Sequence, residues 1–336
     1  MKKVTMNDVA KDAGVSIATV SKVINNKGYV GQQTFENVVM SIQRLGYRVN
    51  ANARSLKSAM SNKVAVLISD ISNFYLMSLA KQIEKTIRTL GMHMILLSHN
   101  DDEAQEYAAL QIILEQQVAA VVIIPTGGNN ETIDYIKNLR IPVIAIDREV
   151  EGVETDLIVD DNHFGSYESM FYLHQLGHHR IGVIYGHFKN SIARDRYQGA
   201  VDAIKDFQLD SEDSLIKKAD FSEESAFQQT TELLQSGEMP TAIYSCNNTM
   251  TKGVIKAIWE QRLKIGEDIS VIAFGERSQW ELFRPQLTLM TQPVNQIGVE
   301  ASILLRDRLT SSMDFPLKTI VIKPILDEGK SCWRLH

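Results

Sequence analysis

The residues best suited to chemistry lie near the start of the chain, in a helical pattern from Ile17 to Asn25. At helical spacing, Val20, Val23 and Ile24 would face inward. The opposite face would carry small, polar and basic side chains, namely Ile17, Ala18, Ser21, Lys22 and Asn25. Hydroxyl, amide and ammonium groups donate to phosphates and base edges, and small apolar groups contact thymine methyls. This face is a candidate for nucleic-acid contacts; the alternative is an ordinary helical hairpin with a solvated polar face.

Two short helices joined by a tight turn would position that face. Thr5 lies three residues before Asp8, a spacing that caps a helix beginning near Met6. Apolar residues then recur at helical spacing, at Met6, Val9, Ala10 and Ala13. Gly14 can adopt the positive φ that ends this helix, and Ser16 can cap the second one. The segment therefore predicts a helix-turn-helix.

Charge divides the chain into two unlike parts. Residues 1 to 63 contain ten Lys and Arg against three Asp and Glu, a balance of +7. The whole chain has a net charge of −6, so residues 64 to 336 carry −13. A basic head on an acidic body indicates that only the head meets a polyanion. The alternative, an accidental cluster of solvated lysines, does not explain why the charge coincides with the helix-turn-helix.

A third helix and a short linker complete the basic head. The third helix is predicted from about Gln32 to Leu45, and its apolar stripe consists of Phe35, Val38, Val39, Ile42 and Leu45. Residues 50 to 58 contain good helix formers, but the segment is too short to remain helical alone in water. We therefore expect it to fold only against a partner.

Two sequence strings in the head resemble the headpiece and hinge of the lactose-repressor (LacI/GalR) family of bacterial transcription regulators. They are V-T-x-x-D-V-A-x-x-A-G-V-S-x-x-T-V-S-x-V-x-N from Val4 to Asn25 and N-x-x-A-x-x-L from Asn50 to Leu56. The resemblance implies that Ile17, Ala18 and Lys22 read bases in the major groove. One departure is Val49, where the family commonly has proline, so we expect a slightly less rigid entry to the hinge.

The same resemblance implies further DNA contacts. Two hinge helices would pair in the minor groove around Ala53, and Leu56 would insert between the central base pairs and kink the duplex. Polar residues would hold the register on the phosphates without reading sequence: Thr5, Asn7, Ser16, Thr19, Ser21, Asn25, Thr34, Tyr47 and Asn50.

The remaining 276 residues are long enough for two compact lobes, and 44% of the whole chain is hydrophobic. Buried strands alternate with helices, which indicates parallel sheets with helices on both faces. The predicted strands are Lys63 to Ile68, Met92 to Ser98, Val121 to Pro125, Val143 to Ile146, Ile181 to Tyr185, Ala242 to Ser245, Ser270 to Phe274 and a last one near Ile320 to Lys323. An amphipathic helix is expected around Phe74 to Leu90. The expected domains are a headpiece (1–49), a hinge (50–60) and a two-lobed effector-binding and dimerisation domain (61–336).

Polar residues follow several of these strands, where ligands bind in open α/β sheets. They are Ser69-Asp70, Asp147-Arg148, Asn247-Asn248 and Gly275-Glu276, each of which could also merely cap a helix. The family resemblance continues here, in S-D-I-S-N-F-Y at Ser69, L-G-H-H-R-I-G at Leu176, R-D-R-Y-Q-G at Arg194 and R-P-Q-L-T at Arg284. It implies lobes like those of periplasmic sugar-binding proteins, with effector contacts from Ser69, Phe74, Asp147, Arg196, Phe221, Asn247 and Gln292. Phe74 and Phe221 could instead be core residues, whereas no nearby apolar stripe requires Arg196.

The expected effector site departs from the family at two positions. Ala273-Phe274-Gly275 stands where relatives have Gly-Phe-Asp, and Asn247-Asn248 stands where they have Asn-Asp. An acidic ligand for sugar hydroxyls is therefore missing, and Glu276, one residue along, should point elsewhere. Because Arg148 and Arg196 are retained, a phosphorylated or acidic sugar is one hypothesis; a neutral glycoside is the other.

Other protein classes lack their signatures. There is no phosphate-binding glycine motif, dinucleotide motif or nucleophile elbow, so we expect no catalytic residues and no cofactor. Gly177 should end the helix that carries His174, so these histidines should not form a metal site with His178 and His179. Two cysteines, Cys246 and Cys332, fit free thiols in a reducing cytoplasm. No apolar leader or membrane-spanning stretch is present.

These features predict a cytoplasmic repressor that binds double-stranded operator DNA. One head would read half a site, so a homodimer on an inverted repeat is expected. The chain lacks a leucine-heptad tail after the last predicted strand, which favours a dimer over a tetramer. A small molecule, most simply a sugar or sugar derivative, would control operator affinity, and whether it induces or co-represses stays open.

Overall fold

The computed structural model describes residues 4–25, 28–47, 61–188, 191–311 and 316–335. The chain divides into two compact units, Met1–Ser61 and Asn62–His336. Each unit has its own hydrophobic core, so each is described separately.

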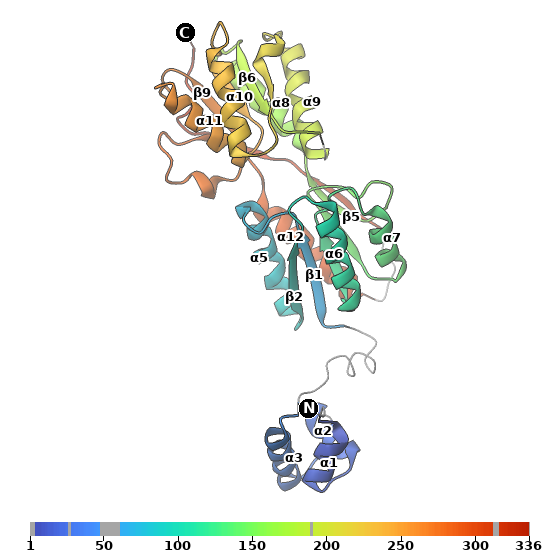
Figure 1. The fold of residues 1–336 in the computed structure, drawn as a ribbon. Helices are drawn as coiled ribbons and strands as arrows, with labels where there is room; N and C mark the ends of the chain where they lie inside the picture. Colours follow the sequence, from blue (N-terminus) through green and yellow to red (C-terminus); the bar gives the residue numbers. More distant parts are fainter. Residues whose placement is uncertain (1–3, 26–27, 48–60, 189–190, 312–315, 336) are drawn as a thin grey trace. The chain divides into compact units, whose positions relative to one another are not determined.

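The described residues of the first unit form three short helices, α1 (Met6–Ala13), α2 (Ile17–Asn25) and α3 (Gln32–Leu45) (Figure 1). The Thr5 hydroxyl accepts a hydrogen bond from the amide of Asp8, and the Asp8 carboxylate returns one from the amide of Thr5. Gly14 has a φ of 67° and ends α1. Local capping therefore fixes the turn that the sequence predicts.

A small core joins these helices. Its buried members are Val9, Ala10, Val20, Val23 and Val38. Ile24 is only partly buried, and the inclusion of Phe35 in the apolar stripe is wrong, since this side chain is 42% exposed. The core covers the middle and last turns of α3, and Phe35 lies in its first turn.

The second unit consists of two lobes. The sheet of the first lobe is wholly parallel. Its strands, in spatial order, are β11 (Thr319–Ile322), β5 (Asp156–Asp160), β4 (Val143–Ile146), β3 (Ala120–Ile123), β1 (Lys63–Ile68) and β2 (His93–Ser98). Helices α5 (Phe74–Thr89) and α12 (Val294–Thr310) cover one face, and α6 (Glu103–Glu115) and α7 (Asn130–Asn138) cover the other.

The sheet of the second lobe has the same layout. Its strands, in spatial order, are β12 (Ile325–Asp327), β10 (Thr288–Thr291), β9 (Ser270–Gly275), β8 (Ala242–Ser245), β6 (Ile181–Tyr185) and β7 (Ile216–Lys218). Only β12 runs antiparallel to its neighbour in this sheet. Helices α8 (Asn162–Gln175) and α9 (Ser191–Asp206) lie on one face, and α10 (Glu223–Gln235) and α11 (Asn248–Glu260) lie on the other (Figure 1). Two short 3₁₀ helices, η1 (Asp213–Leu215) and η2 (Arg277–Trp280), complete the lobe.

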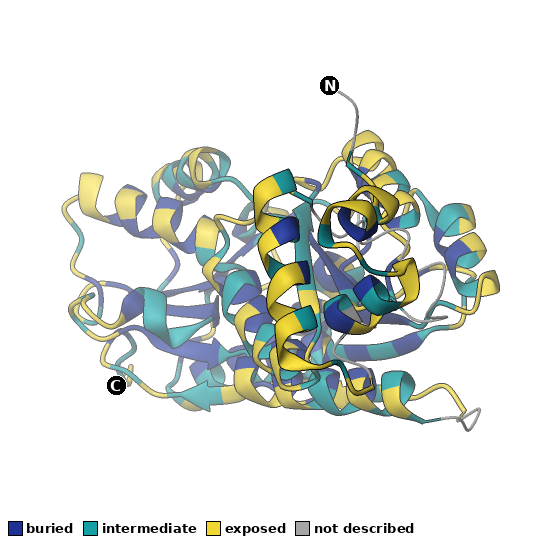
Figure 2. Ribbon diagram, turned by 90° about the horizontal axis from the view of Figure 1, so that it is seen from below, coloured by how far each residue is buried: buried dark blue, intermediate teal, exposed yellow. Residues whose placement is uncertain are grey.

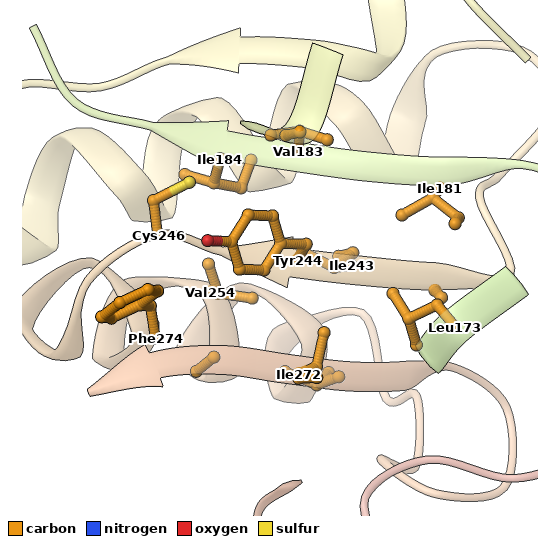
Figure 3. Packing of buried hydrophobic residues seen from close by; sticks show 14 of the residues in the cluster. Leu173, Ile181, Val183, Ile184, Ile243, Tyr244, Cys246, Val254, Ile272 and Phe274 are labelled. Atoms are coloured by element: carbon orange, nitrogen blue, oxygen red, sulfur yellow. The ribbon is translucent and has the colours of Figure 1, made fainter. Parts of the chain in front are cut away.

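The central strands of both sheets are buried, and the helices expose their outer faces (Figure 2). In the second lobe, Tyr244, Cys246 and Phe274 lie together at the carboxyl end of the sheet (Figure 3). The chain crosses between the lobes three times, after β5, after β10 and between β11 and β12. The carboxyl ends of the strands therefore meet at the junction of the lobes.

The predicted strands are confirmed, with shifts of up to two residues at their ends. Strands β5, β7, β10 and β12 were not predicted, and the prediction that the last strand lies near Ile320 is wrong because β12 follows it. β7 and β12 have three residues each, and β5 alternates between buried and half-buried positions, so none of them forms a long apolar run. In the described ranges, no helix is long and apolar enough to cross a membrane.

Candidate functional site

The outer face of α2 carries the predicted base-reading residues. Ile17 is 49% exposed, and Ala18 and Lys22 are also exposed. An exposed isoleucine between polar neighbours is suited to apolar contact with a thymine methyl, and lysine is suited to guanine acceptors. The three side chains share a face that the small core leaves free, so they could enter a groove together.

The predicted phosphate-contacting residues are distributed around α1, α2 and the ends of α3. Thr5, Asn7 and Ser16 are exposed, and Thr19, Ser21, Thr34 and Tyr47 are partly buried. Two of these residues also have a structural role, since the amides of Asp8 and Thr19 donate to the hydroxyls of Thr5 and Ser16 at 3.3 and 3.1 Å. The side chain of Asn25 and all of Asn50, Ala53 and Leu56 lie outside the described residues, so these four remain predictions.

A polar cleft lies at the junction of the two lobes. It consists of two adjoining cavities, which we call the inner compartment (about 240 Å³) and the outer compartment (about 220 Å³). Tyr75, Arg196, Asn247 and Gln292 are among the residues that line both. Ser69, Asp101, Asp147, Arg148 and Phe221 line only the inner compartment, and Ser72, Asn248, Lys252, Phe274 and Gln279 line only the outer one.

Six of the seven predicted effector residues therefore line one cleft; their contact with an effector stays a prediction. The seventh, Phe74, is 49% exposed and does not line either compartment, nor is it core. Helix α5 begins at Phe74, and because each helical residue turns by about 100°, its neighbour Tyr75 faces the cleft instead. Three further lining residues, Asn73, Asp101 and Lys252, were not predicted from the sequence. Asp101 follows a predicted strand, a signal that could have identified it.

Arg196 is anchored at the centre of the cleft and is only 4% exposed. Its Nε donates to the Asn162 side-chain oxygen at 2.7 Å, and its Nη1 donates to the Cys246 carbonyl at 2.7 Å. The guanidinium carbon lies 3.7 Å from the centre of the Phe274 ring. No apolar stripe was expected to require Arg196, but its polar contacts give it a structural role, because they link α9 to α8 and to the residue after β8.

Arg148 is already paired. Its Nη1 and Nη2 donate to the two carboxylate oxygens of Asp101 at 2.5 and 3.3 Å. Burial raises the pKa of Asp101, but the hydrogen bond and charge of Arg148 outweigh burial and hold that pKa below its usual value. This bidentate pair neutralises Arg148, so it does not supply the free cation on which the acidic-sugar hypothesis partly depended.

Buried polar atoms without partners lie behind the inner compartment. Asp160 is 4% exposed; its Oδ2 accepts a hydrogen bond from Gln292 Nε2 at 2.7 Å, and its Oδ1 has no partner among the described residues. The Tyr75 hydroxyl, also buried, lacks a partner in the same part of the chain. Burial raises the pKa of Asp160 to about 7, and burial also raises the pKa of Asp147. Buried polar groups rarely stay unsatisfied, so these atoms indicate a place for water or a ligand.

The raised pKa of Asp160 predicts a specific pH dependence of stability. The folded protein holds this proton up to about pH 7, and the unfolded chain releases it near the ordinary aspartate pKa of 3.8. The stability that the bound proton contributes is therefore lost as pH rises between these two pKa values. Asp160→Asn keeps an oxygen for Gln292 and cannot ionise. We compare the free energy of unfolding of the variant with that of the parent at about pH 5 and at about pH 8. The difference should be about 2 kcal/mol more in favour of the variant at about pH 8 than at about pH 5. Urea unfolding of both proteins at the two pH values measures this; an equal difference at both pH values would contradict the assignment.

The two departures from the family pattern are in contact with each other. A Cβ on Gly275 would lie 1.9 Å from Asn248 Oδ1, so the amide of Asn248 lies directly across the glycine. Asn248 Oδ1 accepts a hydrogen bond from Trp280 Nε1 at 2.7 Å. Glu276 does not line the cleft and instead interacts with the Ser278 hydroxyl. Glu276 therefore does not replace the missing acid, and the prediction that its side chain points elsewhere is confirmed.

The histidines and cysteines outside the cleft have structural surroundings. Helix α8 ends before Gly177, which has a φ of 90°, and among the described residues no group of three His, Cys, Asp or Glu could hold a metal ion. His178 lies between the Thr241 hydroxyl and the Trp333 carbonyl. Cys246 and Cys332 are free thiols whose pKa burial raises to about 12.

Comparison with known proteins decides the family. Residues 5–50 match the model for "Bacterial regulatory proteins, lacI family", and residues 171–332 match the model for a periplasmic binding protein-like domain. The HTH-type transcriptional regulator DegA of Bacillus subtilis (strain 168) is 31% identical over 302 residues, which cover 89% of each chain. The chain belongs to the lacI family.

Other lacI-family comparisons agree over almost the whole length. The HTH-type transcriptional repressor PurR of Actinobacillus pleuropneumoniae serotype 3 (strain JL03) is 29% identical over 333 residues, 99% of each chain. The crystal structure of the lac repressor dimer bound to operator and the anti-inducer ONPF has a TM-score of 0.80 at 25% identity, covering 98% of this chain and 99% of that one. The predicted family and fold class are confirmed, and the chain is a DNA-binding transcription regulator of this family.

Proposed function

We propose that this regulator is a homodimeric repressor in the bacterial cytoplasm that binds an inverted-repeat operator. Ile17, Ala18 and Lys22 read bases, and the polar residues around them hold the phosphates. Two-fold symmetry follows because one small headpiece reads only half a site. The lac repressor dimer, similar in fold over 98% of this chain, was solved on operator DNA, which supports this arrangement.

We also propose that a sugar or sugar derivative in the cleft controls operator affinity. The observation that carries this proposal is the clustering of donors and acceptors with unsatisfied buried atoms. Asp147, Asn247 and Gln292 can bond hydroxyl groups, and the Phe221 ring offers an apolar face for a sugar C–H surface. The unpartnered Tyr75 hydroxyl and Asp160 oxygen lie beside them.

Control by the effector requires that it bind one arrangement of the lobes better than another. Residues of both lobes line the cleft, such as Asp147 of the first and Asn247 of the second, so a ligand bound there would contact both lobes. A coupling free energy of about 1 to 3 kcal/mol between cleft and operator would change operator affinity by about 5- to 150-fold.

Footprinting on the DNA upstream of this gene and its neighbours tests both parts. We expect a protected inverted repeat with a flexible pyrimidine-purine step at its centre, and a sugar that shifts the protein concentration needed for protection. A protected direct repeat or a site without symmetry would rule out the proposed architecture. A symmetric site that no sugar or sugar derivative affects would retain the operator assignment and reject the effector class.

A further inference from the structure

The outer compartment presents a hydrogen-bond donor where relatives present an acid. The indole N–H of Trp280 can only donate, so Asn248 Oδ1 must face it, and Asn248 Nδ2 is the atom left for a ligand. No described residue accepts a hydrogen bond from Nδ2, and Asn248 lines the outer compartment. Gly275 is required for this arrangement because any side chain at that position would displace the amide.

The charges of the outer compartment favour an anion. Lys252 lies one turn after Asn248 on α11; it is exposed and forms no ion pair with any described residue. Arg196, on α9, also lines this compartment. The one acid of this compartment among the described residues, Asp70, is held by the Ser72 amide at 2.7 Å and the Ser72 hydroxyl at 2.8 Å.

The inner compartment has the opposite balance. Asp70, Asp101 and Asp147 face only Arg148 and Arg196, and Arg148 is paired with Asp101. Helix α11 begins at Asn248, which lines only the outer compartment, so the positive end of the helix adds to the field there. The cleft is therefore polarised, with an excess of acids at one end and of donors and cations at the other.

We infer that the effector is anionic, with a phosphate or carboxylate group bound in the outer compartment by Asn248, Lys252 and Arg196. Its hydroxyl-bearing part then occupies the inner compartment, against Asp147 and Phe221. This inference rests on the proposed function and narrows the class of effector. The sequence had suggested Arg148 as one of the anion ligands. The structure instead favours the donors beside Asn248, whose position depends on the glycine at 275.

Calorimetry on the full-length protein, with and without operator, tests the inference. The probes are hexose 6-phosphates, hexuronic acids, their neutral parent hexoses and inorganic phosphate. We expect at least one anionic compound to bind about 10-fold or more tightly than its neutral parent, with an affinity that falls as salt rises. Comparison of the hexose 6-phosphates with the hexuronic acids shows whether the site prefers phosphate or carboxylate. Inorganic phosphate should compete with the compound that binds.

Two variants place the anion. Asn248→Asp keeps an oxygen for Trp280 and replaces the donor by a negative charge, so we expect about 100-fold weaker binding of the anionic compound and little change for its neutral parent. Lys252→Gln, at an exposed position, should lower the affinity for the anionic compound by about 10-fold. Lys256→Gln is the matched control, because Lys256 lies one turn further along α11, over the Phe227 ring and outside the cleft.

The outcomes separate this inference from the proposed function. Binding of neutral sugars without any gain from an anionic group overturns the anion site and keeps the sugar effector. If no compound of either kind binds, both the anion site and the sugar effector are rejected. Unchanged anion affinity in Lys252→Gln and Asn248→Asp also overturns the inference, provided that both variants bind operator like the parent.

Discussion

Replacing Arg196 by alanine is expected to abolish the response to effector. Arg196 lines both compartments, and among the described residues only its Nε and Nη1 have acceptors, so Nη2 is available to a ligand. Loss of a charge-assisted hydrogen bond should cost about 1.5 to 3 kcal/mol, roughly 10- to 150-fold in effector affinity. Calorimetry with the identified effector, and a parallel operator gel shift, measure the affinity and the response.

The same substitution should also lower stability, because Arg196 donates hydrogen bonds both to Asn162 on α8 and to Cys246, the residue after β8. Alanine would leave the Asn162 oxygen and the Cys246 carbonyl without their buried donors, at a cost of about 2 to 4 kcal/mol in the free energy of unfolding. Arg196→Lys is the matched control, since it keeps the positive charge and loses the planar fork. Equal effector affinity in the parent and in a folded Arg196→Ala would remove Arg196 from the site.

Replacing Leu56 by alanine is expected to remove most of the specific affinity for operator. We propose that this leucine inserts between the central base pairs, because the hinge string resembles that of the lacI family. The specific over non-specific ratio of such regulators spans about 10³- to 10⁷-fold, and we expect the variant to lose at least about 100-fold of it. Gel shifts at fixed salt give the affinity, and circularly permuted operator fragments give the bend.

The control for this substitution is Leu56→Met, which retains an apolar side chain of similar size and should preserve the bend. Affinity for non-specific DNA should change little in Leu56→Ala, because phosphate contacts supply most of it. A Leu56→Ala protein that binds and bends operator like the parent would refute the hinge assignment.

Local sequence signals were sufficient to predict many of the helix ends and strands of this protein. The helix starts and stops of the headpiece followed from Thr5, Gly14 and Ser16, since a cap or a positive φ depends on residues within one turn. The long buried strands of both lobes followed from continuous apolar runs such as Lys63–Ile68. The short strands did not, because β7 and β12 have only three residues each and form by pairing with a sheet already in place.

The cleft could be predicted only in outline. The residues that end neighbouring parallel strands meet at one edge, so Ser69, Asp147 and Asn247 were predicted correctly as neighbours of the cleft. Whether Phe74 or Tyr75 faces the cleft depends on where α5 begins, since one residue shifts a side chain by about 100°.

The sequence by itself therefore determined the family, the helix-turn-helix and the presence of a polar cleft, because these depend on local patterns and strand order. Only the tertiary structure decided the chemistry inside the cleft. Arg148 pairs with Asp101, 47 residues away, and Asn248 lies across Gly275 with its oxygen on Trp280. Such partners depend on how the two sheets and their helices pack, and a polar atom that already has a buried partner is no longer free for a ligand.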